Sequence, residues 1–133
     1  MLASMPTTAS VRVLLVDDDA RTLDLFCDAL RMAGYEVDGV PTATAAMDTL
    51  SQRLYHVVMS DNILPDIQGV ELLAAMRGAM PTTPLILYSG DITEAIREQA
   101  KDFGVYAVLE KPISLAQLMD VVRSASGDAR PIT

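Results

Sequence analysis

Short apolar segments alternate with amphipathic helical segments five times along this chain, and this alternation restricts its fold more than any other feature. Three of the apolar segments, VLLV, VVM and LILY, are continuous runs rich in Val and Leu. Such runs suit strands that are buried on both faces of a parallel sheet. Five strand–helix units in succession favour one parallel sheet with right-handed crossovers and helices on both faces, an α/β three-layer sandwich.

Periodicity and turn residues predict where these elements lie. Strands are expected at VLLV, at 35–40, at 56–61, at LILYSG and at VYAVLEKP. Helices are expected from Asp19 to a stop at Gly34, from Thr42 to Leu54, from Val70 through Met76, from Asp91 to Phe103, and from Ser114 onward.

The last two helices carry capping signals at their starts. Asp91 with Glu94 resembles a capping box, and the SLAQ motif at 114–117 matches one. Leu115 and Leu118 then share one side of the final helix, which we expect to face the core.

The bulk composition restricts the class of protein. A length of 133 residues suits one domain with its own hydrophobic core. We expect this domain to span residues 11–125, with flexible tails at 1–10 and 126–133. Ten Lys and Arg against 18 Asp and Glu give a net charge of −8, which disfavours nucleic acid and anionic membranes as direct ligands. The lone Cys27 and the lack of a targeting or membrane-spanning segment predict a cytoplasmic protein.

Polar residues follow four of the predicted strands at the point where each one ends. Asp17–Asp19 follow the first strand, Asp61 ends the third, Ser89 ends the fourth, and Lys111 follows the fifth. The carboxyl ends of parallel strands lie at one edge of a sheet, so we expect these side chains to gather there. Two carboxylates about 4 Å apart repel by roughly 4 kcal/mol at an effective dielectric of about 20, so such a cluster requires a cation. Oxygen ligands without His or Cys favour Mg²⁺ or Mn²⁺.

A cation at this edge makes a phosphoryl group the natural anionic ligand. Lys111 is one of only two lysines in the chain, and an ammonium group binds phosphate as a compact charge. Ser89 offers a hydroxyl to a phosphoryl oxygen. Because carboxylates form acyl phosphates, Asp61 is the expected nucleophile. Asp19 fits a helix cap better than a metal ligand.

Four segments in this order, LLVDDD, MSDNILPDIQG, LYSG and EKP, give the chain a resemblance to the receiver domains of two-component response regulators, the CheY-like superfamily. The resemblance covers about residues 11–124. It implies a flavodoxin-like, doubly wound (βα)5 fold whose five-stranded parallel sheet has the order 2-1-3-4-5. It also implies a phosphorylated signalling switch rather than an enzyme.

The resemblance implies roles for individual residues and partners. Asp17 and Asp18 would position Mg²⁺, Asp61 would be the phosphoacceptor, and the backbone carbonyl of Ile63 would complete the metal ligands. The phosphodonor would be a histidine kinase or a histidine phosphotransfer protein. An output partner would bind the last two helices, and the domain would be a monomer or a weak homodimer.

Two more roles follow from the resemblance, together with one departure from it. Ser89 would take the position of the switch hydroxyl, and Lys111 would contact Asp61 and then the phosphoryl group. The family commonly has an aromatic residue three positions before this lysine, where the chain has Val108. Tyr106 lies two residues earlier and does not match that position. An aromatic switch is therefore not expected at the usual place.

Other functions stay open for a chain with these residues. An Mg²⁺-dependent aspartyl-phosphate phosphatase generally needs an Asp two residues after the nucleophile, where this chain has Ile63. A flavin- or nucleotide-binding module would need a glycine-rich loop after the first strand, where acids stand instead. A receiver-like interaction domain without phosphorylation would not need the set of acids, Ser and Lys. We also expect Ile63 and Asp91 to tune hydrolysis of a phosphoryl group, with Ile63 limiting the access of water. The sequence does not decide whether the chain acts alone or belongs to a longer protein.

Overall fold

The predicted parallel sheet is present in the computed structural model, which describes residues 11–128. Five strands pair in parallel in the order β2-β1-β3-β4-β5. Their bounds are β1 Arg12–Val16, β2 Glu36–Val40, β3 Val57–Asp61, β4 Leu85–Ser89 and β5 Ala107–Glu110. The expected flavodoxin-like strand order is thus confirmed. Of the expected tails at 1–10 and 126–133, all but residues 126–128 lie outside the described residues.

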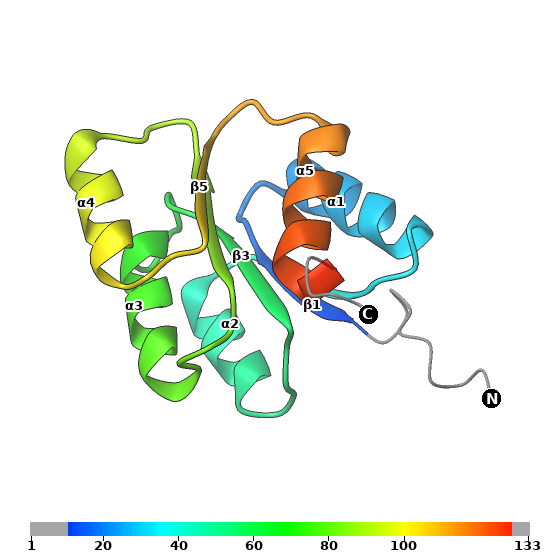
Figure 1. Ribbon diagram of the computed structural model, residues 1–133, viewed down its shortest axis with the longest axis horizontal. Helices are drawn as coiled ribbons and strands as arrows, with labels where there is room; N and C mark the ends of the chain where they lie inside the picture. The colour runs from blue at the N-terminus through cyan, green and yellow to red at the C-terminus, as the bar shows by residue number, and fades with distance from the viewer. Residues whose placement is uncertain (1–10, 129–133) are drawn as a thin grey trace.

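Helices cover both faces of this sheet (Figure 1). Their bounds are α1 Ala20–Met32, α2 Ala43–Leu50, α3 Gly69–Ala79, α4 Glu94–Asp102 and α5 Leu115–Arg123, and a short π-helical segment, Ser124–Asp128, follows α5. Helices α1 and α5 pack on one face, and α2, α3 and α4 pack on the other.

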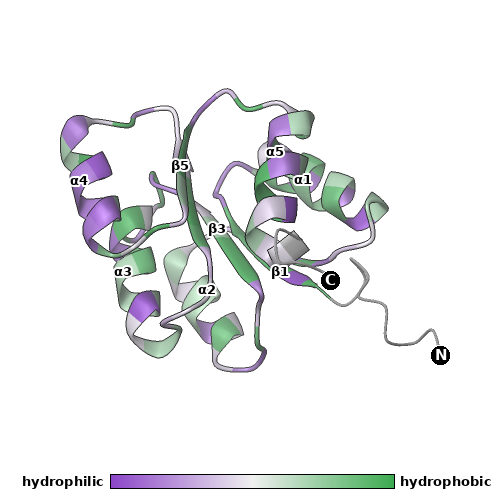
Figure 2. Cartoon of the chain, viewed as in Figure 1, coloured by the Kyte–Doolittle hydropathy of each residue, from purple (hydrophilic) through white to green (hydrophobic). Residues whose placement is uncertain are grey.

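The central strands are buried on both faces because their side chains alternate between two hydrophobic cores. In β1, Val13 and Leu15 belong to the core beneath α1 and α5, whereas Leu14 and Val16 belong to the core beneath α2, α3 and α4. In Figure 2 most of β3 is hydrophobic, whereas α4 carries mostly hydrophilic residues.

The second helix ends four residues earlier than its apolar spacing predicts. Helix α2 stops at Leu50, and Leu54 is 82% exposed instead of buried. The chain beyond the helix is held by two neighbouring strands. Arg53 donates to Asp38 of β2 at 2.8 Å, and the Arg12 guanidinium of β1 donates to the Leu54 carbonyl at 3.1 Å. These contacts tie the segment after α2 to β1 and β2.

The two predicted capping boxes have different outcomes. Thr93, not Asp91, caps α4, because its side-chain oxygen accepts the N–H of Ile96 at 3.1 Å. The box at Ser114 is confirmed, with the Gln117 N–H donating to the Ser114 hydroxyl at 3.0 Å. Leu118 is buried as expected.

Leu115, however, is 42% exposed, so the prediction that it faces the core is wrong. It is the first residue of α5 and stands beyond the end of β5, where the sheet offers no surface to cover it.

One exposed acid of the β3–α3 loop ties that loop to the start of α2. The Asp66 carboxylate accepts the backbone N–H groups of Ala43 and Thr44 at 3.0 and 2.8 Å, and also the Thr44 hydroxyl at 2.8 Å. The Thr44 N–H, followed by that of Ala43, lowers the pKa of Asp66 to about 2. Asp66 is 23 residues from Ala43 and 22 from Thr44 in the sequence, so no local pattern indicates these contacts.

Helix α3 begins where it touches the end of β3, and only glycine fits there. A Cβ atom on Gly69 would lie 2.0 Å from the backbone oxygen of Asp61 and 2.8 Å from the Cα of Asn62. Asn62 also receives the first two N–H groups of the helix, from Gly69 at 2.7 Å and from Val70 at 3.0 Å. The start of α3 is therefore fixed directly against Asp61.

We predict that Gly69→Ala lowers the free energy of unfolding by about 1–3 kcal/mol, because the added methyl group has to displace backbone. Gly78→Ala is the matched control, since it lies in the same helix with nothing within 4 Å of its added Cβ. The control should raise stability by about 0.5–1 kcal/mol. Urea unfolding measures both, and equal stability of the two variants would contradict the close contact.

Candidate functional site

The sequence-predicted site residues meet at the carboxyl edge of the sheet. Asp17 follows β1, Asp61 ends β3, Ser89 ends β4 and Lys111 follows β5. Asp61 pairs with Tyr88 of the neighbouring strand, which places Ser89 one residue further along β4. The parallel order of β1, β3, β4 and β5 is what brings these four strand ends together.

Three carboxylates form a cluster at this edge. Asp17, Asp18 and Asp61 each offer one oxygen, and these atoms all lie within 4.8 Å of one another. Asp17 is fully buried and Asp61 is 6% exposed, whereas Asp18 is exposed. A set of hard oxygen donors of this kind fits Mg²⁺ or Mn²⁺, and a divalent cation would remove the mutual repulsion of the three acids.

Asp19 lies outside this cluster, as expected for a residue at a helix start. It occupies the position before α1, and its carboxylate accepts the Thr22 hydroxyl. Asp19 thus occupies the predicted N-cap position. It makes no side-chain hydrogen bond to a backbone N–H of the first turn, so the predicted capping bond is absent.

Lys111 contacts two of the three acids. Its Nζ donates to Asp61 Oδ2 at 2.9 Å and to Asp17 Oδ2 at 3.4 Å. Burial by itself lowers the pKa of an ammonium group, but the hydrogen bond to Asp61 and the charges of both acids outweigh it, so the pKa of Lys111 is raised. The lysine is therefore charged at neutral pH and is aimed at the carboxylate that sequence analysis predicts as nucleophile.

Tyr88 belongs to the site although sequence analysis did not single it out. It is fully buried, and its hydroxyl donates to Asp17 Oδ2 at 2.6 Å. Burial, followed by the negative charge of Asp17, raises the pKa of Tyr88, so the hydroxyl keeps its proton and acts as a donor. A signal was available: a tyrosine within a fully buried strand requires a partner for its hydroxyl.

Ser89 and Ile63 border the acidic cluster. The Ser89 side chain is fully buried, and its Oγ accepts the Asp91 N–H at 3.4 Å. The Ile63 N–H donates to Asp61 Oδ1 at 3.1 Å, while the Ile63 side chain is 55% exposed. The loop after β3 thus holds one oxygen of Asp61 as Lys111 holds the other.

Val108 and Tyr106, the two residues considered for the family's aromatic switch, do not belong to the acidic cluster. Val108 packs against the core beneath α2, α3 and α4. Tyr106 precedes β5, at the end of that strand opposite Lys111, and its hydroxyl forms a hydrogen bond with Ser124 after α5. Tyr106 therefore lies away from the carboxyl edge.

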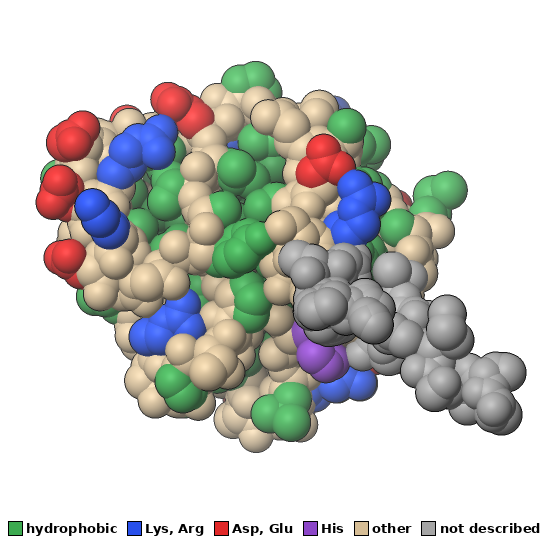
Figure 3. All heavy atoms as spheres, viewed as in Figure 1, with side chains coloured by type: hydrophobic (Ala, Val, Ile, Leu, Met, Phe, Trp, Pro, Cys, Tyr) green, Lys and Arg blue, Asp and Glu red, His purple; other side chains and the backbone are tan. Residues whose placement is uncertain are grey.

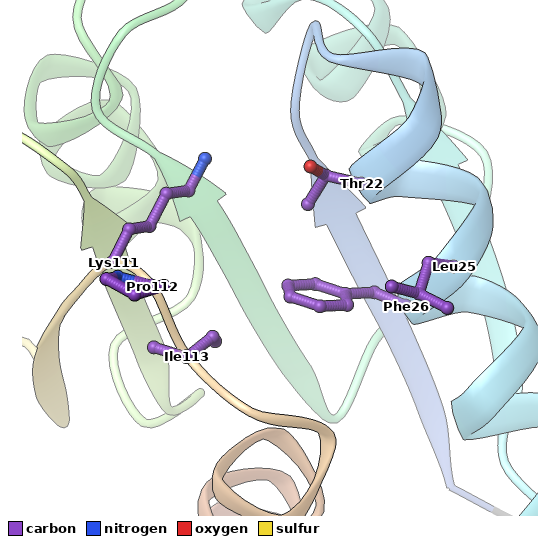
Figure 4. A pocket seen from close by; sticks show the side chains of 6 residues that line it. All are labelled: Thr22, Leu25, Phe26, Lys111, Pro112 and Ile113. Atoms are coloured by element: carbon purple, nitrogen blue, oxygen red, sulfur yellow. The ribbon is translucent and has the colours of Figure 1, made fainter.

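A cavity of about 460 Å³ opens beside Lys111, between α1 and the loop that leads to α5. It is lined by Thr22, Leu25, Phe26, Lys111, Pro112 and Ile113. Figure 4 shows the Phe26 ring reaching from α1 toward this loop, while the Lys111 side chain extends past the cavity toward the strand ends.

Together these features define a class of protein: an α/β domain of flavodoxin-like topology with a cluster of three acids and a lysine-bound carboxylate at the carboxyl edge of its sheet. The chain belongs to the response regulator receiver domain family, whose model matches residues 13–123. It is thus a receiver domain of the two-component type, a signalling switch. Receiver domains bind Mg²⁺ at an acidic cluster, and Asp17, Asp18 and Asp61 form such a cluster here.

Curated relatives support this assignment. The chain is 31% identical over 118 residues to the response regulator protein FleR of Pseudomonas aeruginosa, covering 85% of this chain and 24% of FleR. It is 29% identical over 124 residues to the transcriptional regulatory protein FixJ of Bradyrhizobium diazoefficiens, covering 93% of this chain and 60% of FixJ. The chain thus spans less than two thirds of these relatives.

Solved structures support the fold. A receiver domain protein of Methanospirillum hungatei superposes with a TM-score of 0.86 at 26% identity, covering 89% of this chain and 94% of that one. The receiver domain of an HD domain-containing protein of Pseudomonas fluorescens gives a TM-score of 0.82 at 30% identity, covering 86% and 93%. Among the described residues, no helix has the length and apolar character required to cross a bilayer.

We predict that Mg²⁺ raises the thermal unfolding midpoint of the chain, because the ion binds the folded acidic cluster and not the unfolded chain. Asp18→Asn should weaken Mg²⁺ binding by about tenfold or more through the loss of a charged ligand. Asp19→Asn is the matched control, since this neighbouring acid lies outside the cluster. An equal response of both variants to Mg²⁺ would remove Asp18 from the metal site.

Proposed function

We propose that Asp61 accepts a phosphoryl group from a phosphohistidine donor in an Mg²⁺-dependent reaction and thereby switches the binding of an output partner. The observation that carries this proposal is the contact of 2.9 Å between Lys111 Nζ and Asp61 Oδ2 within the acidic cluster. A buried carboxylate between an ammonium group and a metal site is held in place for attack, and its charge is balanced before and after transfer.

The transfer step follows from this arrangement. A carboxylate oxygen of Asp61 forms a bond to phosphorus as the bond from phosphorus to the donor's imidazole nitrogen breaks, and that nitrogen leaves with the electron pair. Asp17, Asp18, Asp61 and the backbone carbonyl of Ile63 would hold the metal. Bound Mg²⁺ supplies charge stabilisation for the phosphoryl oxygens. Lys111 would bind a second phosphoryl oxygen, and the Ser89 hydroxyl would bind a third.

We propose two kinds of protein partner, a phosphodonor and an output partner. The donor is a histidine kinase or a histidine phosphotransfer protein. We propose that an output partner binds the last two helices. Figure 3 shows hydrophobic side chains over β5 between α4 and α5, and Tyr106 and Leu115 are 46% and 42% exposed.

The net charge of −8 argues against direct contact with nucleic acid or membranes, so we propose none. We assign residues 11–125 to the receiver domain and propose a cytoplasmic monomer or weak homodimer.

Hydrolysis of external substrates is the weaker alternative. A phosphatase with an aspartyl-phosphate intermediate generally needs an acid two residues beyond the nucleophile, and Ile63 stands there. We therefore propose a switch that loses its own phosphoryl group slowly to water rather than an enzyme with turnover of free phosphomonoesters.

We predict that incubation with a small acyl phosphate and Mg²⁺ adds one phosphoryl group to the chain. Intact mass spectrometry detects the adduct, which should be stable in acid and labile in base. Asp61→Asn should remove it, whereas Asp19→Asn, a change of the same kind outside the cluster, should keep it. An undiminished adduct in Asp61→Asn, or Asp61-dependent hydrolysis of phosphomonoesters, would overturn the proposal.

The lifetime of this adduct provides a separate prediction. We propose that Ile63 and Asp91 flank the phosphoryl site and that the exposed side chain of Ile63 limits the approach of water to the phosphoryl group. Ile63→Asn should shorten the lifetime by about tenfold, which corresponds to roughly 1.4 kcal/mol in the barrier. Ile67→Asn is the matched control, because this isoleucine lies in the same loop and is 41% exposed. Unchanged decay in Ile63→Asn would dismiss its role.

A further inference from the structure

We propose that Tyr88 is a positioning residue of the metal site: its hydroxyl fixes the Asp17 carboxylate, which sets the affinity for Mg²⁺ and keeps Lys111 on Asp61. This inference rests on the proposed function, because it assigns a role toward the same cluster. It concerns a side chain of β4 that points to the face beneath α1 and α5, where it joins their core.

The hydrogen bonds of Asp17 show how the carboxylate is fixed. Oδ2 accepts the Tyr88 hydroxyl at 2.6 Å and Lys111 Nζ at 3.4 Å, and Oδ1 accepts the Asp19 N–H at 2.9 Å. A carboxylate oxygen has two lone pairs, so Oδ2 is filled and Oδ1 keeps one acceptor position. The Tyr88 hydroxyl therefore determines that Oδ1 of Asp17 is the oxygen available to a cation.

The same hydroxyl decides which acid holds the lysine. Asp17 and Asp61 compete for Lys111, and the shorter contact, 2.9 Å, goes to Asp61. Asp17 is fully buried and requires strong donors. The Tyr88 hydroxyl is one such donor to Asp17. Without it, Lys111 would be the only side-chain donor to Asp17, and the ammonium group would be drawn away from Asp61 toward the deeper acid.

The Tyr88 ring contacts two neighbours. Phe26 of α1 lies with its ring centroid 6.0 Å from that of Tyr88 and the planes tilted by 42°. Lys111 Nζ lies 4.8 Å from the Tyr88 ring centroid, in the range of a cation–π interaction. These contacts and the full burial of Tyr88 restrict the ring to the position in which its hydroxyl meets Asp17. Phe26 also lines the cavity beside Lys111.

The test uses Tyr88→Phe, which removes one oxygen and keeps the ring. Thermal unfolding midpoints over a range of Mg²⁺ concentrations give the dissociation constant of each variant. We expect Tyr88→Phe to bind Mg²⁺ about tenfold more weakly, the usual effect of losing a residue that orients a metal ligand. Tyr106→Phe, the loss of an exposed tyrosine hydroxyl away from the site, should leave the constant unchanged.

Two results would overturn the inference. A merely structural role for Tyr88 would lower the midpoint equally at every Mg²⁺ concentration and leave the dissociation constant as in the wild type. The second readout is spectroscopic, and it is available because the chain has no tryptophan. Binding of Mg²⁺ should alter the near-ultraviolet tyrosine absorbance of the wild type and of Tyr106→Phe. If it does not, the hydroxyl is not coupled to the metal, whether or not Tyr88→Phe folds.

Failure of the proposed function gives a different pattern. In that case wild-type protein neither responds to Mg²⁺ nor forms the adduct with an acyl phosphate, and the inference falls with it. Where the wild type does both and Tyr88→Phe has an unaltered Mg²⁺ dissociation constant, the function stands and the role of Tyr88 is refuted.

Discussion

The electrostatic balance at the carboxyl edge of the sheet is the constraint on which the site depends. Three carboxylates lie within reach of one ion, and one ammonium group serves two of them. Buried acids at this spacing are unfavourable without positive charge or hydrogen-bond donors. Lys111 supplies the positive charge. Tyr88 supplies a hydrogen-bond donor to Asp17, the acid that lies farther from Lys111 Nζ. Three carboxylates and one ammonium group still leave a net negative charge at this edge. A divalent cation would balance that charge before a phosphoryl group enters.

The parallel sheet is what makes this balance achievable. Asp17 and Lys111 are separated by 94 residues in the chain but share a contact because β1, β3, β4 and β5 all end at one edge. Two contacts also fix the loop that follows Asp61. Gly69 allows α3 to begin against the backbone of Asp61, and Asp66 fixes the same loop to α2. Asp61 therefore lies at the end of a buried strand, and the loop beyond it is tied at two places.

Sequence reasoning succeeded where the signal was periodic and failed where distant polar groups compete. The alternation of apolar runs and helical spacing predicted five strands, five helices and the meeting of Asp17, Asp18 and Asp61. The same spacing placed Leu54 in a helix, but α2 ends at Leu50. The segment after it contacts Asp38 of β2 and Arg12 of β1 instead. Local spacing also favoured Asp91 as a cap, whereas the Thr93 hydroxyl lies closer to the free N–H groups of α4.

By itself, the sequence determined the parallel α/β fold, the acidic cluster and the lysine beside it, because strand ends in a parallel sheet collect at one edge whatever their spacing in the chain. Only the tertiary structure decided how Lys111 divides its contacts, which oxygen of Asp17 stays available, and that Tyr88 belongs to the site. Those choices depend on which face of a strand each side chain takes and on distances of a few tenths of an ångström. Hydrophobic periodicity carries no information at that scale.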